Sequence, residues 1–211
     1  MPSAVDIAQA IARGGTNSPI EVPGVHRRHL ADLFRLRGCK VGAEVGVEKG
    51  AYAEQILSRN PGLHLYCIDA WLAYEGYRNH VKQEQVDGLF VSAQRRLAGH
   101  RVTFIKSMSV EASSQFGDAS LDFVFIDANH DEPHVYADLV AWAPKVRPGG
   151  IVSGHDYCEG WQKSCGTVGV IPAVHRFVRE RGIQTWFVLG DNAMVRDTGR
   201  QEPRSFMWVV Q

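Results

Sequence analysis

The sequence has no net charge, few cysteines and no long apolar run, and each absence excludes a class of protein. Lys plus Arg and Asp plus Glu number 23 each, so nothing indicates the basic surface that binds long nucleic acids. No window approaches the apolar length of a membrane span, and the N-terminus lacks the basic and apolar regions of a signal peptide. The sequence therefore predicts a cytoplasmic protein that binds neither long nucleic acid nor membranes.

The four cysteines form no C-x-x-C pair and fit no closed zinc site. They are expected to be reduced, mostly structural thiols. The chain has 211 residues, of which 45% are hydrophobic, and this is enough for one domain with a substantial core.

Short apolar runs alternate with longer helical patterns through most of the chain. The runs lie at residues 41–47, 63–69, 102–106, 121–127 and 150–154. Such alternation predicts βαβ units and a mostly parallel sheet with helices on both faces. Near the end, Ile183–Leu189 and Ser205–Val210 are joined only by a polar loop, which is typical of an antiparallel hairpin at the sheet edge.

Residues 1–38 show a helical pattern and not the alternation of strands and helices found in the rest of the chain. In residues 1–38, Leu30, Leu33 and Phe34 recur at helical spacing, and we expect a helical lead that packs on the core. Residues 39–211 are expected to form the α/β domain.

The segment Val41–Gly50 is the most informative stretch of the chain, because a strand-like run containing Glu44 passes through glycines into a helical pattern. Glycines at such a turn let a ligand approach the backbone, and the N–H groups of the next helix face it. With Glu44, Gly46 and Gly50, the segment resembles motif I of class I S-adenosylmethionine (SAM) methyltransferases. The alternative is a buried strand with an ordinary glycine turn.

The resemblance implies a single Rossmann-like domain with a seven-stranded sheet, whose last strand is antiparallel, and SAM as cofactor. In open parallel sheets ligands bind at the carboxyl ends of the strands. Asp69 ends the second run, where an acid accepts the ribose hydroxyls, although it is also a good turn former. The cofactor-binding residues implied are Glu44, Gly46, Val47, Gly50, Asp69, Ala70, Trp71, Ser107 and Met108.

The fourth and fifth runs are followed by two acids and two histidines. Neighbouring strands lie about 5 Å apart, so Asp127 can meet His155 and Asp156. The span Leu121–Tyr157 resembles metal-dependent small-molecule O-methyltransferases of the catechol and antibiotic-sugar types. The resemblance implies a divalent metal, magnesium or manganese, on Asp127, His155 and Asp156. It also implies catalytic roles for Asp127 and for His130, the latter as general base.

These patterns leave alternatives open. His155 stands where the family has an acid, and imidazole suits manganese, iron or zinc better than magnesium. Asp131 before Glu132-Pro133 is typical of a helix N-cap.

The leading hypothesis for function is methyl transfer from SAM to a hydroxyl of a small acceptor, a sugar or phenol-like molecule. A metal-dependent hydrolase that uses the Asp/His cluster and a non-catalytic SAM-binding protein are the alternatives. The aromatic segment after Asp69 and the loop 157–170 are candidates for the acceptor pocket, and a homodimer is compatible with the sequence.

Overall fold

The computed structural model describes the chain except residues 16, 74–81, 163–165, 193, 196–199 and 202. The helices are α1 (Ala4–Arg13), α2 (Arg27–Leu36), α3 (Ala51–Arg59), α4 (Gln83–Arg96), α5 (Ser109–Ser113), α6 (Glu132–Trp142), the 3₁₀ helix η1 (Ala143–Lys145) and α7 (Val170–Glu180). The strands of the main sheet are β1 (Ile20–Val22), β2 (Val41–Val45), β3 (His64–Asp69), β4 (Val102–Lys106), β5 (Leu121–Ile126), β6 (Val146–Tyr157), β9 (Phe187–Leu189) and β12 (Arg204–Val209). Two short ribbons pair β7 (Trp161–Gln162) with β8 (Gly166–Thr167) and β10 (Met194–Val195) with β11 (Arg200–Gln201).

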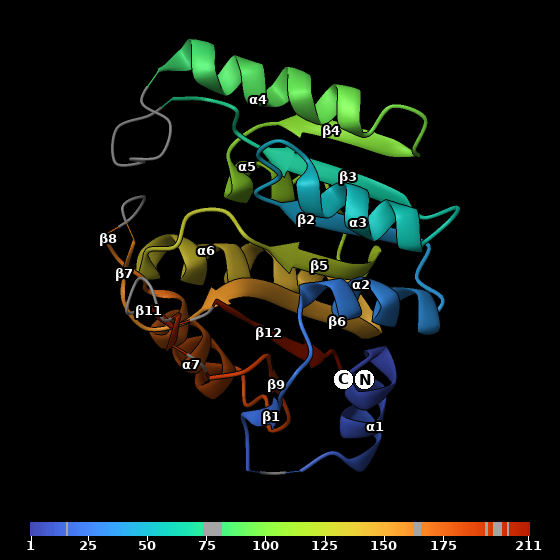
Figure 1. Ribbon diagram of the computed structural model, residues 1–211, viewed down its shortest axis with the longest axis vertical. Helices are drawn as coiled ribbons and strands as arrows, with labels where there is room; N and C mark the ends of the chain where they lie inside the picture. Colours follow the sequence, from blue (N-terminus) through green and yellow to red (C-terminus); the bar gives the residue numbers. More distant parts are fainter. Residues whose placement is uncertain (16, 74–81, 163–165, 193, 196–199, 202) are drawn as a thin grey trace.

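The main sheet has the order β1-β9-β12-β6-β5-β2-β3-β4 (Figure 1). Every neighbouring pair is parallel except those of β12, which runs antiparallel to both β6 and β9. The carboxyl ends of β2 to β6 therefore lie on one edge of the sheet. This confirms the predicted mostly parallel α/β sheet and its antiparallel last strand.

The predicted number of strands was wrong, because the described part of the chain places eight strands in the sheet and not seven. The additional strand is β1, which lies within residues 1–38 and pairs in parallel with β9. A strand of three residues is too short to show a recognisable alternation of polar and apolar side chains. Strands β9 and β12 pair in an antiparallel manner, as predicted. They do not form the edge of the sheet, however, because β1 pairs with β9 on its outer side.

Two apolar cores fill the space on the two faces of the sheet. On β5, Phe123 and Phe125 face a core shared with α1 to α4, whereas Val124 and Ile126 face a core shared with α5, α6 and α7. This alternation follows from the two-residue period of a strand. Among the described residues, no helix combines the length and apolar character needed to cross a membrane.

The start of α6 is fixed by a cap next to the functional edge. The side chain of Asp131 accepts a hydrogen bond from the backbone N–H of His134, and Pro133 lies in the first turn. The predicted N-cap is confirmed, and it ends the loop that follows β5.

Candidate functional site

A cavity lies at the carboxyl ends of β2 and β3 and beside the loops that follow β4 and β5. It holds about 970 Å³ of empty space, including the part that opens to solvent. Its lining includes Gly46, Asp69, Ala70, Met108 and Asp127, all of which were predicted from the sequence as site residues. The ends of four separate strands therefore contribute to one hollow.

The turn between β2 and α3 is held by contacts that only glycine permits at position 46. Gly46 has a φ of 92°, and a Cβ there would lie 2.1 Å from the carbonyl oxygen of Asp127. Its N–H donates to the carbonyl of Ile68 at 2.8 Å. Gly50, with a φ of 77°, precedes α3. The absence of a side chain at Gly46 therefore lets the loop after β5 pack against this turn. Gly46 also lines the cavity.

The carboxylate of Asp69 ties this turn to the end of β3. One oxygen accepts hydrogen bonds from the N–H groups of Val47, at 3.0 Å, and Glu48, at 2.8 Å. The other oxygen accepts from the N–H of Trp71 at 2.8 Å. Asp69 is therefore a turn former and also lines the cavity. Its contact with a ribose stays a prediction.

Glu44 lies beneath the turn and does not line the cavity. Its neighbours in β2, Ala43 and Val45, face the α6 side, so Glu44 points to the opposite face, where Tyr52 lies. Burial raises the pKa of Glu44 well above its usual value, and the charge of Asp127 raises it further. No described residue hydrogen-bonds its Oε2 atom. A direct contact between Glu44 and a ligand therefore stays a prediction.

The residues expected around an adenine base differ in exposure. Trp71 is only 1% exposed, packs 4.6 Å from Phe90 between ring centroids and donates its indole N–H to the carbonyl of Glu48. Met108 is 39% exposed beside the cavity, whereas Ser107 is not among the lining residues. Trp71 mainly supports the wall, and Met108 offers the more accessible apolar surface.

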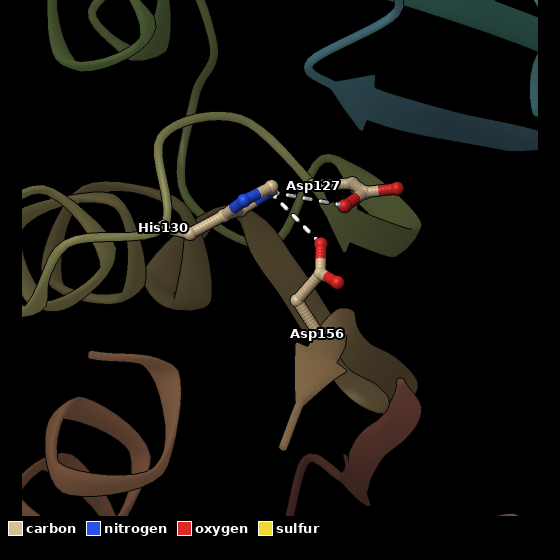
Figure 2. Close-up of side chains that lie close together, drawn as sticks. All are labelled: Asp127, His130 and Asp156. Atoms are coloured by element: carbon tan, nitrogen blue, oxygen red, sulfur yellow. Dashed lines mark ion pairs between the residues drawn. The ribbon is translucent and has the colours of Figure 1, made fainter. Parts of the chain in front are cut away.

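Two acids and two histidines converge at the ends of β5 and β6, as the sequence predicted. Figure 2 shows three of them, Asp127, His130 and Asp156. His130 Nε2 lies 2.9 Å from Asp156 Oδ2 and 3.5 Å from Asp127 Oδ1. His155 Nδ1 lies 3.7 Å from Asp156 Oδ2 and 3.9 Å from Asp127 Oδ1. Asp156 has a φ of 51°, a region that residues other than glycine seldom adopt and that strained functional positions often occupy. We call these four residues the Asp/His cluster.

Charges within the Asp/His cluster shift its pKa values in opposite directions. Burial alone would lower the pKa of His130, but its hydrogen bonds and charge interactions with Asp127 and Asp156 raise it to about 11. Burial alone would raise the pKa of Asp156, but His130 and His155 hold it far below its usual range. The cluster thus forms an ion-paired centre, in which the two carboxylates favour the protonated form of His130.

The structure adds residues that the sequence reading did not select. Arg27, at the start of α2, places its guanidinium 3.2 Å from Asp127 Oδ2. Asp138 and Ser109 line the cavity from α6 and α5. A lone arginine or aspartate in a helix carries no local signal, so only the topology brings these residues to the site. In the aromatic segment after Asp69, which was predicted for the acceptor pocket, Tyr74, Tyr77 and His80 lie outside the described residues. The same holds for residues 163–165 of the loop 157–170.

Comparisons with known proteins agree with this geometry. A family model described as a methyltransferase domain matches residues 43–157. No match was found among curated protein sequences.

Solved structures show a similar fold along nearly the whole chain. The O-methyltransferase TomG from Streptomyces achromogenes, involved in tomaymycin synthesis and solved with SAM, is 17% identical with a TM-score of 0.60, and the match covers 99% of this chain and 97% of that chain. An O-methyltransferase from Bacillus cereus, solved with S-adenosylhomocysteine (SAH), is 15% identical with a TM-score of 0.54, and the match covers 99% of this chain and 90% of that chain. At these identities the likeness establishes the fold.

Proposed function

The chain belongs to the methyltransferase domain family, and we propose that it transfers the methyl group of SAM to a hydroxyl of a small molecule. The observation that carries the proposal is the position of the Asp/His cluster, because Asp127 belongs both to this cluster and to the cavity wall. A donor bound in the cavity would then present its methyl group beside a set of residues able to bind and deprotonate a hydroxyl.

The order of the lining residues along the sheet supports a position of the SAM methyl group beside the Asp/His cluster. Asp127 lies at the end of β5, Asp69 at the end of β3 and Met108 after β4, in the order in which these strands cross the sheet. We place the methionine part near Gly46 and Asp127, the ribose at Asp69 and the base near Met108. This order leaves the sulfonium next to the Asp/His cluster.

The cluster has the donor set of a divalent-cation site. Asp127, His130 and Asp156 offer ligand atoms that lie within 4.8 Å of one another, and His155 Nδ1 is close to both carboxylates. We propose that Asp127, His155 and Asp156 hold the cation. Mixed oxygen and nitrogen ligands fit manganese, iron or zinc better than magnesium. Such a cation would lower the pKa of an acceptor hydroxyl and so favour its deprotonation.

His130 is the proposed general base. The charges of Asp127 and Asp156 raise the pKa of His130. His130 can therefore act as a base near neutral pH only when another positive charge, such as the proposed cation, compensates these two carboxylates. Asp127 and Asp156 then hold the imidazole in position through the contacts seen in Figure 2.

A chelator is expected to abolish methyl transfer, and a divalent cation is expected to restore it. The measurement is SAH release from SAM with a panel of small hydroxyl acceptors, repeated with manganese, iron, zinc and magnesium. The His155→Asp variant should shift the preference toward magnesium, because a hard oxygen replaces a nitrogen ligand. Activity that is insensitive to the chelator would reduce these residues to polar contacts with the acceptor.

The Asp69→Ala variant is expected to bind SAH at least about tenfold more weakly, because it loses the charged acceptor for the ribose hydroxyls. It should also be less stable, because three backbone N–H groups lose their partner. Asp122→Ala is the matched control. Asp122 accepts from the N–H groups of Lys40 and Val41 at the opposite end of the sheet, so its loss should lower the melting temperature and leave SAH affinity unchanged. Equal SAH affinities of both variants would remove Asp69 from the binding site.

The two alternative functions are distinguished by the same assays. The methyltransferase family match does not favour a hydrolase. A non-catalytic SAM-binding protein would bind SAH in calorimetry and transfer no methyl group to any acceptor. The zero net charge supports a small acceptor rather than a long nucleic acid.

A further inference from the structure

The cavity contains a buried acid that takes no part in the Asp/His cluster. Asp138, on α6, is 3% exposed and lines the cavity. Its Oδ1 accepts a hydrogen bond of 2.5 Å from the hydroxyl of Ser109, and that hydroxyl accepts one of 3.0 Å from the indole N–H of Trp142. The described residues provide no hydrogen bond to its second oxygen, Oδ2, and this oxygen is not among the fully buried atoms that lack a partner, so it opens into the cavity. A ligand that fills the cavity would displace water from this oxygen, so binding is costly unless the ligand supplies a hydrogen-bond donor in its place.

The residues around Asp138 indicate which kind of ligand would fit beside it. The same cavity is lined by the exposed apolar side chains of Leu72, Met108 and Val110, and His134 lines it from the helix that carries Asp138. Leu72 and Val110 are each 50% exposed, which is high for large apolar residues in a folded protein. A flat aromatic group between them would cover this surface, and a donor on its edge would satisfy Asp138.

The order of the strand ends around the cavity is compatible with a nucleobase beside Asp138. Asp127 marks one part of the cavity, Asp69 follows on β3, and Ser109 comes after β4. A nucleoside whose ribose lies at Asp69 and whose substituent points toward Asp127 directs its base away from β5, toward Ser109. Asp138 is held beside this base through Ser109.

We propose that Asp138 accepts a hydrogen bond from the exocyclic amine of adenine, with Ser109 and Trp142 holding its carboxylate, and so makes the cavity selective for a 6-aminopurine. This assignment rests on the proposed function, since it takes the ligand to be SAM or SAH. Burial raises the pKa of Asp138 to about 6, and the hydrogen bond from Ser109 lowers it in part. The carboxyl group is therefore ionised at neutral pH and acts as an acceptor.

A site that donates to or accepts from a ligand group discriminates strongly against a ligand without that group, because its own polar atom is left unpaired. The probes are SAH and its analogue with hydrogen in place of the 6-amino group, and the measurement is titration calorimetry at pH 7.5. The parent protein should bind SAH at least about tenfold more tightly than the analogue. In Asp138→Ala and Asp138→Leu, which have no acceptor at this position, the ratio should fall to within about threefold of one.

The Glu132→Gln variant is the control, since Glu132 is an exposed acid on the same helix, and its ratio should equal that of the parent. A purely structural link between α5 and α6 predicts another result: the Asp138 variants would lose stability and bind both ligands more weakly, with the ratio unchanged. An unchanged ratio, or a parent that binds both ligands equally, would overturn the proposal and leave the proposed function intact. A parent that binds SAH in no condition would overturn both.

Discussion

Replacement of Gly46 by alanine is expected to lower the free energy of unfolding by about 3 kcal/mol or more and to abolish SAH binding. A Cβ at this position would lie 2.1 Å from the carbonyl oxygen of Asp127 and 2.6 Å from the Cα of Ala128. Both are backbone atoms, so no change of rotamer relieves the contact. The N–H of Asp127 is also bound to the carbonyl of Val45 at 2.7 Å, which resists a shift of the loop. Urea denaturation and calorimetry with SAH are the measurements.

Gly62→Ala is the matched control for this experiment. Gly62 has a φ of 85°, close to the 92° of Gly46, but a Cβ there would meet nothing within 4 Å. Its replacement should cost only the backbone strain, about 1 kcal/mol, and should not affect SAH binding. The difference between the two variants isolates the contact with Asp127. Equal losses of stability would mean that the loop after β5 moves away easily.

The sequence predicted those parts of the fold and site that depend on local pattern. The runs that became β2, β3 and β5 are mostly apolar and buried, as expected of central parallel strands. The antiparallel position of β12 followed from a connection too short for a crossover helix. The convergence of Asp127 with Asp156 followed from the adjacency of two strand ends. These inferences need only the periods of strands and helices and the rule that ligands bind at carboxyl ends.

Features that depend on tertiary contacts were not predicted. The three residues of β1 join the sheet only because β9 provides an edge for pairing. Arg27 reaches Asp127 across 100 positions of sequence, and Asp138 meets Ser109 across 29. The direction in which Glu44 points did not follow from the sequence either, because a strand buried on both faces has no polar side that fixes its orientation.

The His130→Ala variant is expected to lower the rate of methyl transfer by about a hundredfold, because general base catalysis contributes on that scale. Its SAH affinity should stay close to that of the parent, since His130 lies in the Asp/His cluster and is not among the residues that line the cavity. The measurement is the single-turnover rate at saturating SAM. His64→Ala is the control, because His64 starts β3 at the opposite end of the sheet and should leave the rate unchanged.

The pH dependence separates a base from a purely structural histidine. In the cluster as described, the pKa of His130 is raised from 6.5 to about 11, so its stabilising effect is complete below pH 6.5 and is lost as the pH rises toward 11. With a chelator present, the parent should therefore lose more stability than His130→Ala between pH 7 and pH 10.

With a divalent cation present, the charges of Asp127 and Asp156 are engaged, and the cause of the raised pKa is removed. The rate of the parent should then rise with pH through the imidazole range, and His130→Ala should lack this inflection. A normal rate in the variant would remove His130 from the mechanism. A lowered rate that keeps the inflection would make it a positioning residue for Asp156, because another group would then be the one that loses the proton.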